Sequence, residues 1–533
     1  MHAGSSDLPA RKWSIVALGS VGVFAVLLSY LLTLTLGIGL LSLPVVCFWQ
    51  VQTPSFLALR VLLSIFGLIA GPTVLWSLVP RRDKFEAPGA RIDLSREKRL
   101  AAEVEAIAKT LKEPMPSEVY LMLEANAFVA QRGGFMGIGS RRIMAVGLPL
   151  MQMLTIAQFR AVLAHEFGHF YAGDTRLGPW VYNARSAMVR VFTNLGERSE
   201  LIQALTRFLV ISLAHMLVMG GISLYWKFFM RLTQLISRSQ EYRSDEIACH
   251  IAGSEALIAG LENMTKCNAA LPAFWQRVVM PVAQHGYRPR LADGFMRFME
   301  ASNVAQATAN HLQQAIANTK TDAMNTHPPL QRRIERARKY AIAEKQYTAS
   351  GALSSEPMIS LIDDLDALET QLLRPYLCAD GGPELKLMDW NTAGSEVYVP
   401  AWRQQTAPYQ SRLSQVPVKS LASLLRGRDA LSNHILNPRG LLLSQAQREG
   451  PAREIVAIAL ALTLMDQGWS LVIEPGSFRT QRAELTIDPS QIVARMHAGQ
   501  LPEPEWQTLC AQAGIGDYRL AASQESPAAD TNS

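Results

Sequence analysis

Two long stretches without charged side chains lie near the start of this 533-residue chain and restrict the folds open to it. No Asp, Glu, Lys or Arg occurs between Lys12 and Arg60, or between Arg60 and Arg81. About 20 consecutive apolar residues are enough for a helix to cross a bilayer, whereas a helix in a soluble core keeps polar positions on its solvent side. The sequence therefore predicts two transmembrane helices, near 14–36 and 57–80.

Basic residues on either side of these segments indicate how they are oriented. Arg11 and Lys12 precede the first segment and Arg81 and Arg82 follow the second, whereas residues 50–55 between the two contain neither Lys nor Arg. Positive residues concentrate in cytoplasmic loops, so both flanks are expected on the cytoplasmic side. The rest of the chain would then face the cytoplasm.

The clearest chemical motif is His-Glu-Phe-Gly-His at 165–169, an HExxH pattern. Residues four apart share one face of a helix, so both imidazoles can bind one metal ion while Glu166 acts as general base on a metal-bound water. Thr155 and Gln158 form the capping-box signature of a helix start, after an apolar run at 143–148 that indicates a strand. A surface helix can carry this pattern without a metal, so further ligands have to support the interpretation.

A third ligand is expected downstream, in the segment Ser-Arg-Ser-Gln-Glu-Tyr-Arg-Ser-Asp at 237–245. Glu241 and Asp245 are four residues apart, which places them on one face of a helix. One carboxylate can complete a zinc site while the other orients a ligating histidine from outside it. Spacing alone also allows a solvated helix face, with Arg238 and Arg243 beside the carboxylates.

Together these motifs resemble those of the HtpX-like and CAAX-prenyl-protease-like membrane zinc peptidases, which are HExxH gluzincins. The resemblance covers residues from about 85 to 340 and keeps the family's order of motifs. It rests on HEFGH followed by Asp174, on EYRSD at 241–245, on Asn126-Ala127-Phe128, and on His327-Pro328-Pro329 with Arg333 six residues after the histidine. Ser244 stands where many members have alanine, which is a small change.

The resemblance implies a metal centre with one Zn²⁺ per chain. His165, His169 and Glu241 would be the zinc ligands, and Glu166 would be the general base. Other motifs supply the surroundings of the metal. Asp245 and Asp174 would support the ligands from behind, and His327 with Arg333 would stabilise the tetrahedral intermediate. Residues 126–128 would bind the substrate as part of an edge strand.

Without the other motifs, the histidine at 327 reads as a loop residue ahead of a helix that has proline near its start. The arginines that follow it then read as a solvated helix face. Asn126 alone reads as a turn residue.

The function that this resemblance implies is a membrane-bound zinc endopeptidase of the bacterial cytoplasmic membrane. It would cut membrane or membrane-proximal proteins, in protein quality control. A prenyl-peptide protease is an alternative, although that subgroup is implied to have more membrane helices. A non-proteolytic chaperone or scaffold with a structural zinc is a second, but such a site needs no Glu166. A transporter would need more long apolar runs than this chain contains.

A third apolar stretch, 208–230, lies between His169 and Glu241 and constrains the topology. If this stretch crossed the bilayer once, the two residues would lie on opposite sides and could not bind one ion. It must pair with a second crossing near 177–195 or not cross. Arg185 and Arg190 are costly in lipid, so we expect a buried or membrane-dipping hairpin near 177–230.

The expected fold class is mainly α (α+β). We expect a membrane region at 1–84, a zincin-like peptidase domain with a small edge sheet at 85–345, a linker at 346–357, an α/β accessory domain at 358–522 and a disordered tail at 523–533. The accessory domain contains no recognisable catalytic constellation.

Composition excludes other classes of function. The net charge of +6 is spread along the chain and forms no basic patch with interleaved aromatic residues, so no nucleic-acid partner is expected. Five widely separated cysteines indicate reduced thiols, in agreement with a cytoplasmic catalytic domain. The glycines at 133–139 lack the order of a phosphate-binding loop and favour a hairpin. The expected partners are a protein or peptide substrate and the lipid membrane, and the sequence carries no sign of an oligomeric state.

Overall fold

The computed structural model describes residues 13–50, 56–135, 138–171, 178–196, 207–318, 327–344, 354–377, 385–426 and 445–521. The chain forms two compact units: Met1–Thr265 with Leu312–Leu368, and Lys266–His311 with Glu369–Ser533. Helices predominate in both, and the sheets are small, as the expected mainly α class requires.

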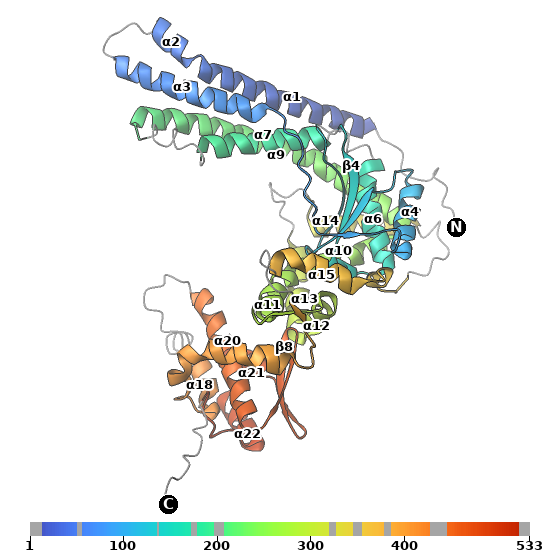
Figure 1. Ribbon diagram of the computed structural model, residues 1–533, viewed down its shortest axis with the longest axis vertical. Coiled ribbons are helices and arrows are strands. Elements are labelled where there is room, and N and C mark those ends of the chain that lie inside the picture. The colour runs from blue at the N-terminus through green and yellow to red at the C-terminus, as the bar shows by residue number, and fades with distance from the viewer. Residues whose placement is uncertain are drawn as a thin grey trace, which may run out of the picture. The chain divides into compact units, whose positions relative to one another are not determined.

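The first unit contains a bundle of long apolar helices. These are α1 (Trp13–Leu41), α2 (Leu43–Gln50), α3 (Leu57–Leu78), α7 (Gly178–Gly196) and α9 (Leu209–Ala252). In Figure 1 α1 and α3 lie side by side with α7 and α9. Three segments are long and apolar enough to cross a membrane: Val23–Leu41, Leu57–Leu78 and Leu209–Arg231.

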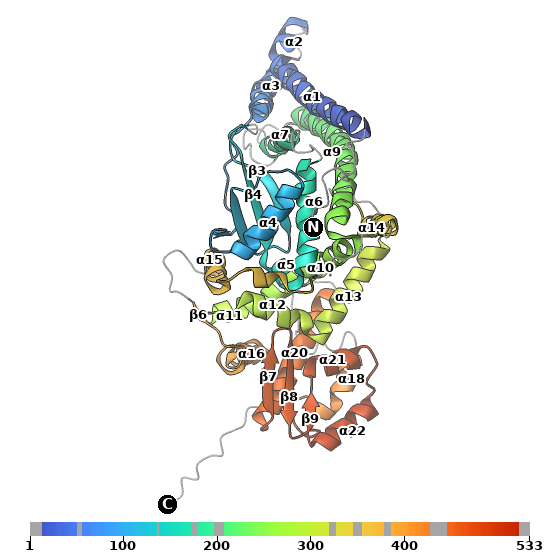
Figure 2. The same cartoon turned by 90° about the vertical axis from the view of Figure 1, so that its right-hand side faces the viewer.

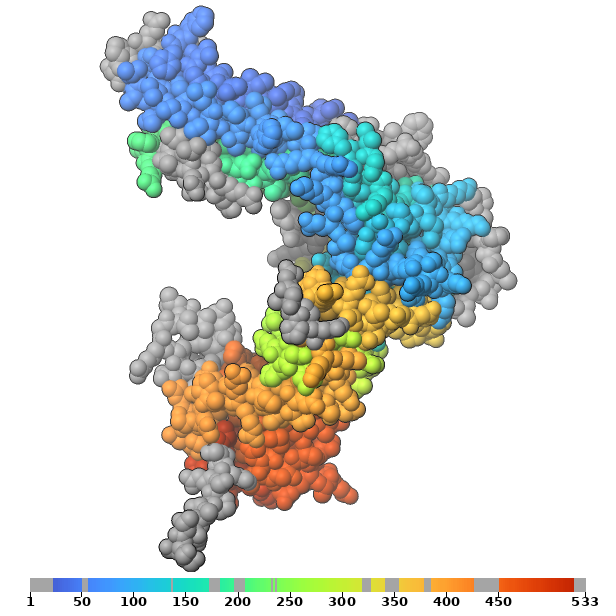
Figure 3. All heavy atoms as spheres, viewed as in Figure 1, coloured from blue at the N-terminus to red at the C-terminus, as the bar shows by residue number. Residues whose placement is uncertain are grey.

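The third of these segments lies where a buried or membrane-dipping hairpin was expected. Helix α7 runs back along α9, so the two do form a hairpin, but its second arm is itself apolar enough to span a bilayer. Much of its apolar surface is open, as it is on α1 and α3, and these helices extend away from the rest of the unit in Figure 3.

The two arginines of α7 are accommodated by hydrogen bonds. Arg190 donates from Nη2 to the carbonyl oxygen of Ser77 at 2.8 Å, at the end of α3 where helix carbonyls lack internal partners. Arg185 donates to Thr233 Oγ1 at 3.2 Å. The cost of placing Arg190 in this apolar hairpin is therefore offset locally, whereas Nε of Arg185 is buried without a hydrogen-bond partner among the described residues.

Close packing of α1 against α3 depends on glycine. A Cβ atom on Gly67 would lie 2.3 Å from the carbonyl oxygen of Leu40, and one on Gly71 would lie 2.9 Å from the amide of Leu41. Small residues at such contacts let two helix backbones approach closely, which is the usual way that helices associate in lipid.

A four-stranded sheet supports the part of this unit that carries the HExxH motif. Its strands are β1 (Ala90–Ile92), β2 (Glu118–Met122), β3 (Ala127–Arg132) and β4 (Arg141–Gly147), in the order β1-β2-β4-β3. Strand β4 is parallel to β2 and antiparallel to β3, so the glycine-rich segment forms the expected hairpin and β3 is an edge strand. Gly133 and Gly134 have φ of 79° and 78° in that hairpin, a conformation that favours glycine.

Helix α6 (Ile156–Tyr171) lies between the sheet and α9, and α14 (Leu330–Glu344) packs against α9 beyond it (Figure 2). Helices α4 (Lys98–Thr110) and α5 (Leu148–Met153) complete this layer. Both faces of α6 are covered, which explains why Phe159, Leu163 and Phe167 are buried on a helix with little amphipathic character.

The second unit is built around α20 (Gln445–Asp466) and an antiparallel meander, β7 (Ser470–Glu474), β8 (Ser477–Arg482) and β9 (Leu485–Ile487). This agrees with the α/β class expected for residues 358–522. Three further helices, α10 (Ser254–Phe274), α13 (Ser302–Ala317) and α15 (Leu365–Leu377), lie partly in each unit. The other elements of the second unit are η3 (Trp275–Val279), α11 (Met280–Gln284), β5 (Tyr287–Arg288), α12 (Leu291–Glu300), β6 (Lys386–Leu387), η5 (Gly394–Tyr398), α16 (Val399–Thr406), η6 (Ala407–Tyr409), α17 (Gln410–Leu413), η7 (Val418–Ser420), α18 (Leu421–Arg426), α21 (Pro489–His497) and α22 (Glu503–Ala513).

The division of the chain does not follow the expected boundary at 346–357. Residues 266–311 pack with the C-terminal part: β5 pairs with β6, and the buried carboxylate of Glu369 accepts hydrogen bonds from the amides of Leu291 and Ala292 at the start of α12. The end of the expected linker instead joins the first unit, where η4 (Met358–Leu361) follows a main-chain pairing with the start of α6. These contacts join segments far apart in sequence.

Candidate metal centre

Helix α6 positions the two histidines of the HExxH motif. The expected capping box is present: the Thr155 amide donates to Gln158 Oε1 at 3.2 Å, and the Gln158 amide donates to Thr155 Oγ1 at 3.3 Å. This cap fixes where the helix starts and therefore which residues face α9. His165 and His169 then lie one turn apart with ring centroids separated by 5.0 Å.

Helix α9 brings Glu241 to these histidines. Nε2 of His165 lies 3.6 Å from Oε2 of Glu241, and Nε2 of His169 lies 3.6 Å from Oε1. One potential ligand atom of each residue falls within 4.8 Å of the others. Atoms bound to the same tetrahedral Zn²⁺ are about 3.3 Å apart, so two nitrogens and a carboxylate oxygen in this arrangement fit such an ion.

The close approach of α6 and α9 at this level depends on Gly168. A Cβ atom there would lie 3.2 Å from the Cα of Ser244. Glycine in the HExxH motif and a small residue before Asp245 therefore let Glu241 reach both histidines.

Asp245 orients His165 from behind the candidate metal site. Its Oδ1 lies 3.0 Å from Nδ1 of His165, which directs Nε2 of that imidazole towards Glu241. Arg333 holds the same carboxylate with two hydrogen bonds, Nε to Oδ2 at 2.9 Å and Nη2 to Oδ1 at 2.7 Å. Burial raises the pKa of Asp245, but Arg333 and His165 lower it further, to about 2, so the carboxylate is ionised.

A partner of His169 was not expected from the sequence. Nδ1 of His169 lies 3.1 Å from Oγ of Ser244, so both imidazoles are oriented by residues of α9. From the sequence, Ser244 is only a small replacement for the alanine found in many family members. Its position three residues after Glu241, on the same helix face, is the signal that could have identified it.

The charges of this cluster favour a cation beside the Glu241 carboxylate. Burial lowers the pKa of His165, but hydrogen bonds to Asp245 and Glu241 outweigh it and raise this pKa to about 9. Burial raises the pKa of Glu241, and hydrogen bonds from His165 and His327 lower it much further. Burial and the neighbouring His165 lower the pKa of His169 to about 3, which leaves it neutral, as a metal ligand must be.

Glu166 lies between the first histidine and the edge strand. Its carboxylate accepts a hydrogen bond from the main-chain N–H of Val129 in β3, while burial raises its pKa. The candidate general base is thus oriented by β3, the strand that the resemblance associates with substrate binding.

The HPP motif contributes two side chains from the start of α14. Nδ1 of His327 lies 2.8 Å from Oε2 of Glu241, and its imidazole is 57% exposed. Arg333 is buried, with Nη1 3.8 Å from the same Glu241 oxygen. Burial lowers the pKa of Arg333, but the Asp245 carboxylate raises it further, so the guanidinium stays charged. His327 is therefore open to a substrate, whereas Arg333 is engaged with Asp245.

The remaining expected site residues lie at the edge of the sheet. Asn126 precedes β3, and its Oδ1 accepts a hydrogen bond from the amide of Ala127 at 2.9 Å. Phe128 packs on the sheet face that carries Tyr120 and Met122. Asp174 lies outside the described residues.

Comparisons with known proteins agree with this geometry. Residues 94–341 match the model of peptidase family M48. The chain is similar to Protease HtpX of Pseudomonas entomophila (strain L48), with 27% identity over 156 residues, which cover 27% of this chain and 50% of the relative. It is also similar to Protease HtpX of Ectopseudomonas mendocina (strain ymp), with 23% identity over 231 residues, covering 41% of this chain and 67% of that protein.

A third such protein, Protease HtpX of Erwinia tasmaniensis, is 25% identical over 236 residues, covering 41% of this chain and 65% of the relative. The chain spans about half the length of the first of these proteins. The matched region contains all the motifs on which the resemblance is based. Residues 94–341, a little under half of the chain, thus resemble peptidase family M48, and the chain is a membrane protein by its long apolar helices and its similarity to HtpX proteases.

Proposed function

We propose that this protein is a membrane-bound, zinc-dependent endopeptidase that hydrolyses peptide bonds of membrane or membrane-proximal proteins in quality control. The observation that carries the proposal is the convergence of His165, His169 and Glu241 on one point, with Glu166 beside it. A purely structural zinc site has no use for a buried carboxylate that is held next to the ligands but is not one of them.

The three ligands would hold one Zn²⁺. When bound, such an ion polarises a peptide carbonyl and makes water acidic enough to attack at neutral pH. The buried carboxylate–guanidinium pair of Asp245 and Arg333 holds His165 in the tautomer whose Nε2 is free to ligate.

Glu166 acts as general base and then as general acid. It takes a proton from the attacking water and passes that proton to the nitrogen of the leaving amine. A carboxylate whose pKa is raised by burial is better suited to both transfers than an exposed one. The hydrogen bond from Val129 keeps it directed at β3.

His327 and Arg333 take different roles in this proposal. His327 is exposed at the site and donates a hydrogen bond to the oxyanion of the tetrahedral intermediate. Arg333 acts through Asp245, because two of its nitrogens are already committed to that carboxylate. The arginine is therefore a positioning residue, and the histidine is the catalytic one.

The substrate would lie along the free edge of β3 as an added strand. The edge offers main-chain donors and acceptors without reference to side chains, which suits a peptidase that cuts many sequences. Asn126, Ala127 and Phe128 would fix the start of this edge.

The position of the site relative to the membrane follows from α9. Arg231 ends the candidate span, and Glu241 comes ten residues later on the same helix, which is about 15 Å along its axis. With the basic flanks of the first two spans in the cytoplasm, the site would face the cytoplasm close to the surface of a bacterial inner membrane.

Metal content and proteolysis of three purified proteins test the proposal. Wild type is expected to bind one zinc per chain and to cut an unfolded protein such as casein. Glu166→Gln should keep the zinc and lose proteolysis by roughly a factor of 10³ or more. Glu241→Ala should lose both. Cleavage retained in metal-loaded Glu166→Gln protein would contradict the mechanism, and zinc retained in Glu241→Ala would contradict the ligand set.

A further inference from the structure

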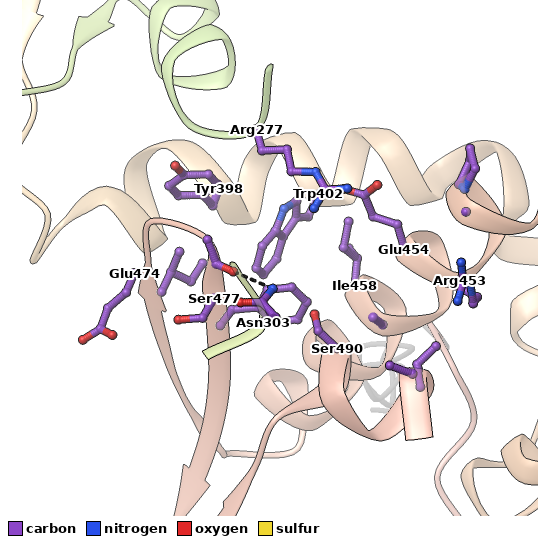
Figure 4. Close-up of a pocket in the computed structure, with 18 residues that line it drawn as sticks. Arg277, Asn303, Tyr398, Trp402, Arg453, Glu454, Ile458, Glu474, Ser477 and Ser490 are labelled. Carbon is purple, nitrogen blue, oxygen red and sulfur yellow. Dashed lines mark hydrogen bonds between the residues drawn. The ribbon is translucent and has the colours of Figure 1, made fainter. Parts of the chain in front are cut away.

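The second unit contains a cavity that the proposed peptidase mechanism does not use. Its volume is about 490 Å³, within the range of small-ligand sites. It is lined by η5, α16, the N-terminal half of α20, the β7–β8 hairpin and α21, together with Arg277 and Asn303. Every lining residue belongs to the second unit (Figure 4).

The floor of this cavity is aromatic and apolar. In Figure 4 the indole of Trp402 lies between Tyr398 and Ile458. Its ring centroid is 4.7 Å from that of Phe478 and 6.1 Å from that of Tyr398. These rings belong to the hydrophobic core of the unit, so the floor is rigid and preformed. Such a surface favours an aliphatic or aromatic side chain.

The rim is polar but carries no net charge. Arg277 and Glu454 are both exposed, and neither forms an ion pair with any residue that the structure describes. Arg453 and Glu474 also line the cavity, one charge of each sign. Asn303, whose Nδ2 donates to the Gly476 carbonyl oxygen at 3.1 Å, completes a rim of mixed donors and acceptors.

We infer that this cavity binds a short, uncharged apolar segment of an unfolded polypeptide. One or two side chains of the segment fill the aromatic floor, and its main-chain carbonyl and amide groups meet the guanidinium and carboxylate of the rim. A nucleotide or another phosphate ligand needs a positive excess, which a balanced rim does not supply. An acyl chain offers no polar partner to the guanidinium of Arg277 or the carboxylate of Glu454.

This inference adds a second peptide site to the proposed peptidase. It rests on the proposed function only in explaining what the bound segment is for. A second peptide site, away from β3, would hold an unfolded substrate while its chain is cut elsewhere. Binding itself does not require cleavage, so the two proposals can be tested separately.

Binding is tested on the full-length chain in detergent, with Glu166→Gln to prevent cleavage. The probe is a fluorescein-labelled nonapeptide of Gly and Ser with a central Phe-Leu pair, measured by anisotropy. The comparison peptide has Ser-Ser in place of Phe-Leu and should bind at least roughly tenfold more weakly, since two buried side chains are lost. Equal affinity for the two peptides would overturn the inference.

A matched pair of substitutions locates the binding. Ala494 is exposed on α21 and lines the cavity, so Ala494→Trp fills the space from its solvent side. Ala511 is an exposed alanine on α22 outside the lining, and Ala511→Trp adds the same side chain elsewhere. Affinity should fall at least tenfold in the first variant and stay unchanged in the second. Unchanged binding in Ala494→Trp, or equal loss in both, contradicts the site.

A second variant covers the case in which Ala494→Trp does not fold. The double change Arg277→Gln and Glu454→Gln alters only exposed side chains and should weaken the Phe-Leu peptide severalfold. Retained affinity here, with Ala494→Trp unfolded, would also contradict the inference.

Cleavage assays with an active chain separate this inference from the peptidase proposal. Ala494→Trp should slow the cleavage of unfolded casein severalfold and leave the cleavage of a short peptide at the wild-type rate. Equal effects on both substrates contradict a separate docking site. If wild type cuts neither substrate, the peptidase proposal fails, and the anisotropy result still decides the cavity.

Discussion

The metal centre and the cavity of the second unit use charge in opposite ways. At the candidate metal centre Glu241, Asp245 and Arg333 are buried. Glu241 lies against His327, and Asp245 and Arg333 pair with each other. Around the cavity the charges lie on an exposed rim, and the buried groups are aromatic. Buried charge demands partners at fixed positions, whereas an exposed rim does not. The first region is therefore specified residue by residue, and the second by shape.

The sharpest test of this contrast is Asp245→Asn. The change leaves the Arg333 guanidinium buried without its counter-charge and removes the group that orients His165. We expect a loss of about 3–5 kcal/mol in the free energy of unfolding. Zinc affinity should fall by roughly 10- to 100-fold. Chemical denaturation and metal titration measure the two effects.

Glu246→Gln is the matched control, because it neutralises the next carboxylate of α9, which is only partly buried. Zinc affinity and stability should stay close to wild type in that variant. If Asp245→Asn behaves like its control, the buried pair does not organise the metal site.

Gly168→Ala should have an intermediate effect. Its Cβ would press on the Ser244 backbone at 3.2 Å and force α6 away from α9. Overpacking of this kind costs about 1–3 kcal/mol, and here it also separates the histidines from Glu241. Thermal unfolding and zinc affinity should both fall.

The comparison for Gly168→Ala is Gly260→Ala in α10, where the nearest atom, Val162 Cγ2, lies 3.5 Å away. Alanine in a helix interior with that much room is expected to raise stability by up to about 1 kcal/mol. A loss of zinc affinity in both variants would point to a general effect on the fold and not to the contact of α6 with α9.

The smallest effect is expected at the rim of the cavity. Arg277→Gln and Glu454→Gln remove charges that are exposed, so each should change the free energy of unfolding by less than about 0.5 kcal/mol. Denaturant titration of the two single variants measures this. A loss near that of Asp245→Asn would erase the contrast between the two regions.

The same contrast explains which parts could be predicted from the sequence. The capping box at Thr155, the pairing of the motif histidines and the face shared by Glu241 and Asp245 all follow from helix spacing, which is local. The hydrogen bond of Val129 to Glu166 and that of Ser244 to His169 depend on how α6 packs between β3 and α9. Spacing along one element carries no information on such contacts.

Two other features were also beyond local reasoning. Arginines such as those of α7 are costly in lipid, and the carbonyl that accepts from Arg190 belongs to the end of α3, more than a hundred residues earlier in the chain. Residues 266–311 lie within the region that matches peptidase family M48, and they also pair with β6 and Glu369, far along the chain. Both depend on partners that no nearby residue indicates.

Helix α9 is continuous over 44 residues, from the candidate span at Leu209 to Ala252, and so measures about 66 Å. A helix whose apolar stretch does not match the thickness of the bilayer responds by tilting. No break in α9 lies between the candidate span and Glu241, so a tilt of the span would be transmitted along the helix to this carboxylate. The thickness of the host membrane would then be a physical variable of the candidate metal site.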